Sequence, residues 1–309
     1  MTAPAAEWTA RDAAACLRRP RPEDDKYRRG VLGIRTGSEA YPGAAVLGVE
    51  AAHRTGIGMV RYLGPATATG LVLQRRPETV TADGRVQAWV IGSGTDAAAR
   101  TPAETAALRG ILSGDVPVVV DAGALDLAVG ATAPMVVTPH AGEHARLRAR
   151  LGLPDVTEPS EAARTEAAWE TARALGATVL LKGAVTIVAT PSGWTRLVVA
   201  GTPWLATAGT GDVLAGAIGA LVAAACGPMG APGTRHAPTG AAGPLAGDRV
   251  GSVDAEELGR LAATGALLHG RAGRLAADTL GPVGGPITAL DVAAALPRAV
   301  GELLGGLAG

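Results

Sequence analysis

A glycine-rich turn, AGTGD at residues 208–212, leads directly into the apolar run VLAGAIGALVAAAC at residues 213–226. The run is long enough for a buried helix but shorter than the roughly 20 residues that cross a bilayer. Glycines let the backbone approach a ligand closely, and the free amides at a helix start favour an anion. The segment therefore predicts a helix whose first turn faces a phosphate or a transferring phosphoryl group.

The same turn also has a plainer interpretation, in which Asp212 only caps the helix. It is not a Walker P-loop, because the chain contains no Gly-Lys-Ser or Gly-Lys-Thr. It is not a dinucleotide fingerprint either, because no third glycine follows in register. The motif by itself leaves the structural and the functional interpretation open.

Outside this helix, apolar β-rich segments alternate with Ala-rich segments of helical length. Strands are expected at 31–34, 59–62, 89–91, 116–120, 135–137, 178–181, 186–189 and 196–199. Helices are expected at 42–55, 101–112, 143–151, 159–175, 212–225, 254–277 and 290–304. The pattern predicts an α/β fold with a mainly parallel central sheet flanked by helices on both faces. We expect one domain over residues 1–309, with a flexible Gly/Pro-rich loop at 227–251.

The composition excludes several classes of protein. The 309 residues carry 28 basic and 28 acidic side chains, and this zero net charge argues against nucleic-acid and anionic-membrane partners. There is no Phe, so the core must be built from Ala, Val, Leu and Ile. Two cysteines cannot form a multi-disulfide scaffold. The N-terminus has no signal-peptide core, and we expect a soluble cytoplasmic protein.

Five polar segments follow predicted strands. They are Gly92-Ser93-Gly94, Asp121-Ala122-Gly123, Thr138-Pro139-His140, Lys182-Gly183 and the 208–212 turn. In an open α/β sheet, ligands bind at the carboxyl edge of the strands. Lys182 also stands out by composition, because only two of the 28 basic residues are lysines. A lysine there can meet phosphate oxygens as a point charge, although an ordinary turn residue is the alternative.

The segment His140-Ala141-Gly142-Glu143-His144 matches the His-x-x-Glu-His pattern of zinc peptidases. That pattern needs one continuous helix, whereas Pro139 and Gly142 interrupt this one, so we expect no protein-held metal. His140 is expected to be a polar residue of the cleft. The remaining histidines, His53, His236 and His269, are expected to be structural or on the surface.

Taken together, the motifs resemble the ADP-dependent NAD(P)H-hydrate dehydratases, a family of repair enzymes with a ribokinase-like fold. The resemblance runs from about Asp24 to the last helix. The segments that carry it are KYRRG (26–30), GS (37–38), YPGAA (41–45), GSG (92–94), DAGAL (121–125), TPHAGE (138–143), LKG (181–183) and AGTGD (208–212). The family usually has proline at the positions of Ser93 and Ala141 and often glycine at that of Ala208. None of these departures removes a charged side chain.

The resemblance implies a reaction in which ADP phosphorylates the hydroxyl of NAD(P)H hydrate, and phosphate then leaves. The products are NAD(P)H, AMP and phosphate, with Mg²⁺ as cofactor. The implied catalytic base is Asp212. The implied substrate site consists of Ala44, Gly94, His140 and Asp212. The implied ADP site consists of Lys182, Gly183, Ala184, Val185, Thr186 and Gly211, and the anion hole of Ala208, Gly209, Thr210 and Gly211. Asp121 is a weaker candidate for metal binding or support.

The resemblance also implies a homo-oligomer, for which we expect a tetramer. Many family members carry an N-terminal epimerase domain, so epimerisation is expected from a separate chain. Two alternatives remain open: a ribokinase-like small-molecule or vitamin kinase that uses ATP, and a nucleotide-binding regulator without turnover.

Overall fold

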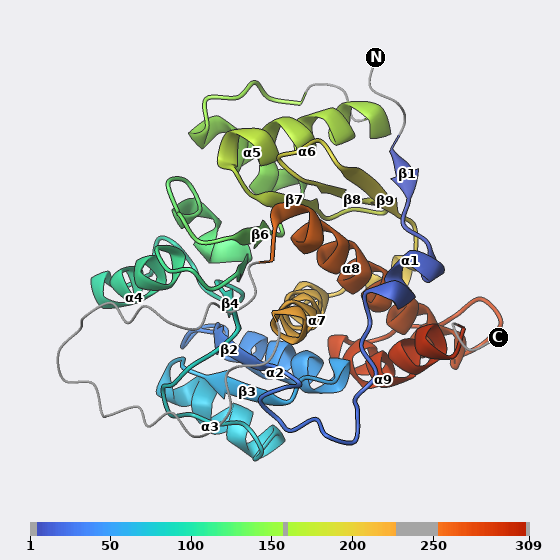
Figure 1. Cartoon of the computed structure of the whole chain (residues 1–309). Helices are drawn as coiled ribbons and strands as arrows, with labels where there is room; N and C mark the ends of the chain where they lie inside the picture. The colour runs from blue at the N-terminus through green and yellow to red at the C-terminus, as the bar shows by residue number, and fades with distance from the viewer. Residues whose placement is uncertain (1–4, 157–159, 227–252, 307–309) are drawn as a thin grey trace.

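The computed structural model describes residues 5–156, 160–226 and 253–306, whose strands form one sheet between two layers of helices (Figure 1). The nine strands of these residues lie in the order β1-β9-β8-β7-β6-β5-β4-β2-β3. They are β1 (Ala6–Glu7), β2 (Val31–Arg35), β3 (Met59–Tyr62), β4 (Ala88–Ile91), β5 (Val118–Val120), β6 (Met135–Val137), β7 (Thr178–Leu181), β8 (Thr186–Ala189) and β9 (Thr195–Val198). Strands β2 to β7 pair in parallel, β8 is antiparallel to β7 and β9, and β1 is parallel to β9. The predicted α/β class is confirmed.

Helices cover both faces of this sheet. The α-helices of the described residues are α1 (Ala10–Ala15), α2 (Gly43–Thr55), α3 (Ala66–Arg75), α4 (Pro102–Leu112), α5 (Ala141–Arg150), α6 (Glu161–Leu175), α7 (Thr210–Ala225), α8 (Ala255–Asp278) and α9 (Ala289–Gly305). Short 3₁₀ helices lie at Ala122–Leu127 and Pro203–Leu205. None of these helices is long and apolar enough to span a membrane.

Two large hydrophobic clusters bury most of the sheet, because successive side chains of a strand point to opposite faces. A third, small cluster holds Val31 of β2 and Met59 of β3. Val119 belongs to the larger cluster, with α2, α7, α8 and α9. Its neighbours Val118 and Val120 belong to the second cluster, with α4, α5 and α6. Burial on both faces explains why these strands are continuously apolar in sequence.

The strand order reverses beside β2. The chain passes from β2 to the edge strand β3 and then returns to β4 on the other side of β2. Ligands of open α/β sheets bind outside the carboxyl ends of the strands at such a switch point. The loops after β2 and β4 are therefore expected to border a ligand site.

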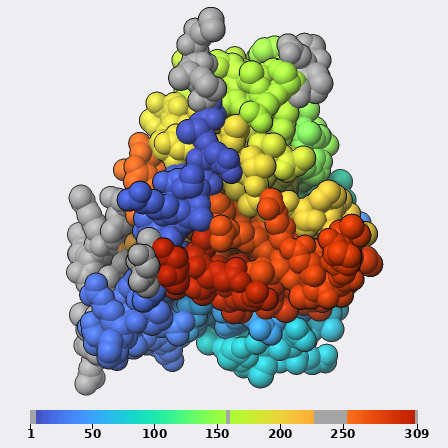
Figure 2. All heavy atoms as spheres, turned by 90° about the vertical axis from the view of Figure 1, so that its right-hand side faces the viewer, coloured from blue at the N-terminus to red at the C-terminus, as the bar shows by residue number. Residues whose placement is uncertain are grey.

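The N-terminal segment was not predicted as ordered structure. Figure 2 shows it lying against the C-terminal helices. Trp8 Nε1 donates to Thr264 Oγ1 of α8 at 3.2 Å, and the Trp8 ring packs edge-on against Trp194 with centroids 5.6 Å apart. These contacts fix β1 and α1 on the outside of α8.

Several element boundaries differ from the expected ones. The strand expected at 116–120 begins at Val118, because Pro117 has no N–H to donate to the ladder. Helix α5 begins at Ala141 rather than 143, because His140 caps it. Helix α3 was not predicted. The expected loop at 227–251 lies outside the described residues, and the expectation of a single domain stays a prediction.

Candidate active site

Three strands end in side chains that meet at one carboxylate, that of Asp121, which follows β5. Ser93 Oγ donates to Asp121 Oδ2 at 2.9 Å, and Thr138 Oγ1 donates to Oδ1 at 2.7 Å. Lys182 Nζ donates to the same Oδ1 at 2.9 Å. Asp121 is only 3% exposed, so these donors orient a buried carboxylate. The carboxyl edge of the sheet thus brings together four of the five polar segments.

Lys182 is the positive charge of this cluster. Its Nζ also lies 3.7 Å from Glu143 Oε2, and its side chain is 22% exposed. Burial lowers the pKa of Lys182, but the charges of Asp121 and Glu143 outweigh it and raise the pKa above its ordinary value. The side chain therefore presents a permanent cation to the space beside it.

Asp212 lies in the first turn of α7 and caps nothing. The N-cap is Gly209, and the helix receives no side-chain cap bond. Among the described residues, none hydrogen-bonds to the Asp212 carboxylate. Burial and then the negative charge of Asp121 raise the pKa of Asp212 to about 7, although Lys182 lowers it. Asp212 is therefore a carboxylate able to take up a proton near neutral pH.

The turn before α7 offers amides to a ligand. The first N–H groups of a helix have no partner within it and carry the positive end of its dipole. A Cβ added at Gly211 would lie 3.8 Å from Lys182 Nζ, so this turn approaches the lysine. The hydroxyl of Thr210 donates to Leu205 and Thr207 carbonyls, which leaves only the Thr210 amide for an anion. Ala208 is exposed beside the N-cap.

A cavity of about 180 Å³ opens between the β7–β8 turn and the start of α7. Of the six residues expected to bind ADP, five line it: Lys182, Gly183, Ala184, Thr186 and Gly211. The sixth, Val185, does not line the cavity, and its carbonyl accepts a hydrogen bond from Arg164 Nη2 at 3.2 Å. Val185 therefore helps to fix the β7–β8 turn through this bond rather than by lining the cavity.

Two of the expected substrate residues, Ala44 and Gly94, border the switch point. A Cβ added at Gly94 would lie 2.3 Å from Ala44 Cβ, so the loop after β4 touches the start of α2. One turn along α2, a Cβ at Gly48 would lie 3.6 Å from the Asp212 carbonyl. A second cavity, of about 490 Å³, lies beside them and is lined by Tyr41, Thr95, Glu143 and Arg146 among others.

His140 has a structural task that the sequence did not indicate. Its Nδ1 accepts from the amides of Gly142 and Glu143, while Glu143 Oε2 accepts from the His140 amide at 2.7 Å. This reciprocal arrangement is a capping box. The side chain is still 56% exposed, and its Nε2 lies 3.5 Å from Glu143 Oε1.

The second histidine of the zinc-like pattern points elsewhere. His144 is buried, its Nε2 bonds to Thr171 Oγ1 at 2.9 Å, and burial lowers its pKa to about 4. No group of three or more His, Cys, Asp or Glu side chains within the described ranges is arranged to hold a metal ion.

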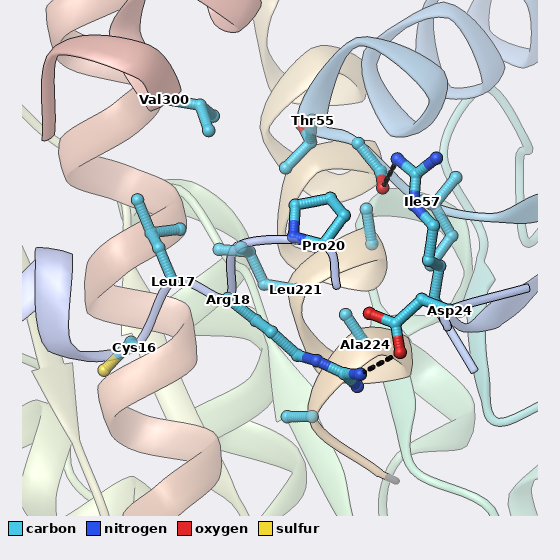
Figure 3. A pocket seen from close by; sticks show the side chains of 14 residues that line it. Cys16, Leu17, Arg18, Pro20, Asp24, Thr55, Ile57, Leu221, Ala224 and Val300 are labelled. Carbon is cyan, nitrogen blue, oxygen red and sulfur yellow. Dashed lines mark hydrogen bonds and ion pairs between the residues drawn. The ribbon is translucent and has the colours of Figure 1, made fainter. Parts of the chain in front are cut away.

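The cavity drawn in Figure 3 lies at the other end of α7, where Arg18 pairs with Asp24 at 2.6 Å. It is lined by Leu221 and Ala224. Ala224 follows Asp212 by about 18 Å of helix. The charged groups that line this cavity already have partners. Arg18 pairs with Asp24, and Arg29 Nη2 donates to the Gly56 carbonyl at 2.8 Å. This cavity is separate from the Asp212 site.

Gly209→Ala is expected to destabilise the protein by about 2–4 kcal/mol and to lower activity. Gly209 has a φ of +89°, and an added Cβ would lie 2.5 Å from Leu47 Cδ1. Urea denaturation measures the effect. Gly110→Ala is the matched control, because it meets nothing within 4 Å inside α4 and should be neutral or slightly stabilising. Wild-type stability of Gly209→Ala would contradict this account of the turn.

Comparison with known proteins agrees with the geometry. A family model described as NAD(P)H-hydrate dehydratase matches residues 32–297. The chain is 34% identical over 250 residues to an ADP-dependent (S)-NAD(P)H-hydrate dehydratase of Xanthomonas campestris, covering 73% of this chain and 83% of that protein. It is 49% identical over 230 residues to a bifunctional NAD(P)H-hydrate repair enzyme of Mycobacterium tuberculosis, covering 70% of this chain and 46% of that protein.

Among solved structures, an ADP/ATP-dependent NAD(P)H-hydrate dehydratase of Bacillus subtilis, co-crystallised with ATP/Mg²⁺, superposes with a TM-score of 0.76. The identity is 25%, and the match covers 98% of this chain and all of the other. The fold is ribokinase-like, as expected. The chain spans about half the length of the bifunctional relatives that it matches.

Proposed function

The chain belongs to the NAD(P)H-hydrate dehydratase family, and from this premise we propose that it dehydrates the S form of NAD(P)H hydrate at the expense of ADP. The products are NAD(P)H, AMP and phosphate. The observation that carries the proposal is an unpaired Asp212, with a pKa near neutrality, at a helix start beside Lys182.

The chemistry follows from the positions of the charged groups. The ADP phosphates lie at Lys182 and the first amides of α7, which hold negative charge as the phosphoryl group transfers. Asp212 accepts the proton of the substrate hydroxyl, the oxygen attacks the terminal phosphorus of ADP, and AMP leaves. The carbon–oxygen bond of the phosphoester then breaks. Phosphate departs, a proton leaves the neighbouring ring carbon, and the double bond of NAD(P)H is restored.

The acidic groups also fit a magnesium ion. The charges of Asp121, Glu143 and Asp212 all raise the pKa of Lys182, so three carboxylates gather around this amine. Mg²⁺ is usually bound by one or two carboxylates together with substrate phosphates, rather than by a complete protein cage. Glu143 would hold the ion together with the ADP phosphates, and the ion would neutralise charge on the phosphoryl group.

The proposal is tested by mixing the protein with NADH hydrate, Mg²⁺ and either ADP or ATP. The reduced-nicotinamide absorbance is expected to rise, with AMP formed from ADP. A small-molecule kinase would instead give a stable phosphoester of its own substrate and no gain of absorbance with the hydrate. A regulator without turnover would bind nucleotide and give no product.

The pH dependence reports on Asp212. The base works only when it is deprotonated, so kcat/KM is expected to rise with pH up to about 7 and then level off. Steady-state rates between pH 5.5 and 8.5 measure this, with ADP affinity followed by calorimetry at each pH. A profile that is flat across this range, with constant ADP affinity, would contradict the role of Asp212.

We extend the proposal to assembly and location. The protein is proposed to act in the cytoplasm as a homo-oligomer, with a tetramer as the first expectation and a separate epimerase chain as partner. The exposed Tyr41 at the rim of the larger cavity supports a contact there, with substrate or with a second copy. Light scattering of the purified protein tests the oligomeric state.

A further inference from the structure

His269 reaches the nucleotide cavity from α8, a helix that contributes none of the expected site residues. The cavity has a polar end, at Lys182 and Gly211, and an apolar remainder. The apolar lining consists of Val198, Ala200, Leu205, Leu214 and Ala266. His269 is the one imidazole among the residues that line it. Nothing in the sequence indicated that this histidine lines a cavity.

The ring of His269 is neutral, and within the described part of the chain one of its nitrogens has no partner. Burial lowers the pKa of His269 to about 4, so the ring is neutral at physiological pH. A hydrogen bond to the Thr210 backbone raises the pKa, as a bond donated by the imidazole does. Nε2 is buried and has no hydrogen-bond partner among the described residues. In the tautomer with its proton on Nδ1, the neutral imidazole offers Nε2 as a free acceptor.

A buried acceptor without a partner is costly and requires an explanation. Here the atom belongs to a residue that lines the cavity beside Thr210, at the start of α7. A nucleotide whose phosphates lie at Lys182 would extend its ribose and base into the apolar remainder of that cavity. Both parts carry donors, in the ribose hydroxyls and the exocyclic amine of adenine.

We propose that His269 Nε2 accepts a hydrogen bond from the nucleoside part of the bound nucleotide and so helps select its ligand. The inference rests on the nucleotide site of the proposed function. His269 touches the nucleotide and not the reacting phosphorus, so it determines specificity and position rather than chemistry.

The experiment measures binding of nucleotides to the full chain by calorimetry, without the hydrate. The probes are ADP, 2′-deoxy-ADP, 3′-deoxy-ADP and inosine diphosphate, which lacks the exocyclic amine. His269→Leu is expected to weaken ADP binding about 5- to 100-fold. One analogue should bind more weakly than ADP to the wild type, whereas His269→Leu should bind that analogue and ADP with the same affinity. That analogue identifies the donor.

A structural role predicts a different pattern, in which His269→Leu changes all affinities by the same factor. Equal analogue-to-ADP ratios in wild type and variant would therefore overturn the inference. His53→Leu is the matched control, because His53 bonds to Thr79 away from the cavity. His53→Leu should leave every analogue-to-ADP affinity ratio at its wild-type value.

If His269→Leu does not fold, ¹⁵N NMR of the wild type replaces it. Addition of ADP is expected to shift the Nε2 resonance of His269, and an unchanged resonance at saturating ADP would overturn the inference. The proposed function fails separately. A wild type that binds none of the nucleotides contradicts the nucleotide site itself, whereas binding and turnover with unchanged ratios contradict only the role of His269.

Discussion

Asp212→Asn is expected to lower turnover of the hydrate by roughly 10²- to 10⁴-fold while ADP binding survives. Asparagine keeps the size of the side chain but cannot accept the hydroxyl proton. The amides of the α7 turn and Lys182 remain, so the nucleotide site is intact. Rates at saturating substrate and calorimetry with ADP measure the two effects. Turnover near that of wild type would show that Asp212 is not the base.

The same substitution is expected to stabilise the protein above pH 7. The pKa of Asp212 in the folded state, about 7, lies above its ordinary value of 3.8. The folded protein therefore holds this proton more tightly than the unfolded chain, and stability falls as pH rises between these values. Asparagine removes that loss, on the order of 2–4 kcal/mol.

Asp291→Asn provides a control of opposite sign. The pKa of Asp291 is lowered by hydrogen bonds from the backbone and side chain of Thr288. The ionised Asp291 carboxylate therefore stabilises the fold at pH values above its ordinary pKa of 3.8. Asp291→Asn removes this stabilisation and should destabilise the protein at pH 8. Loss of stability in both variants would contradict the electrostatic account of Asp212.

Lys182→Met is expected to have the second large effect, on binding and on stability together. It removes the cation at the nucleotide phosphates, and it leaves the buried Asp121 carboxylate without its charge partner. Breaking one side of a buried ion pair costs about 3–5 kcal/mol. The apparent KM for ADP should rise more than that for the hydrate.

The double variant Lys182→Met/Asp121→Asn separates the two effects. Asparagine at 121 removes the unpaired charge and keeps an oxygen for Ser93 or Thr138, so much of the lost stability should return. ADP binding should stay weak, because the phosphate contact is still missing. Recovery of ADP affinity in the double variant would mean that Lys182 acts only through Asp121.

Much of the site could be predicted from chain order, because polar residues after parallel strands share one edge of the sheet. Ser93, Asp121, Thr138 and Lys182 meet for this reason. The role of Asp212 could not be decided in this way. Its pKa depends on burial and on the charge of Asp121, which are set only when the sheet and α7 pack together.

The features that were missed have weak local signals. Helix α3 buries only Ala68 and Val72, so its sequence lacks a clear apolar face. Strand β1 has two residues and pairs only with β9. His269 sits in an apolar helix like any core residue. Its place at the nucleotide cavity follows from the packing of α8 against the start of α7, a tertiary contact without a sequence pattern.

The central claim, that the hydroxyl leaves as phosphate after accepting a phosphoryl group from ADP, is tested most directly with ¹⁸O in the hydrate hydroxyl. Wild-type protein should produce NADH, AMP and inorganic phosphate in equal amounts, and each phosphate should carry one ¹⁸O. Mass spectrometry of the phosphate gives the result. Unlabelled phosphate formed together with NADH would mean that water, not the hydroxyl, accepts the phosphoryl group, and would contradict the account.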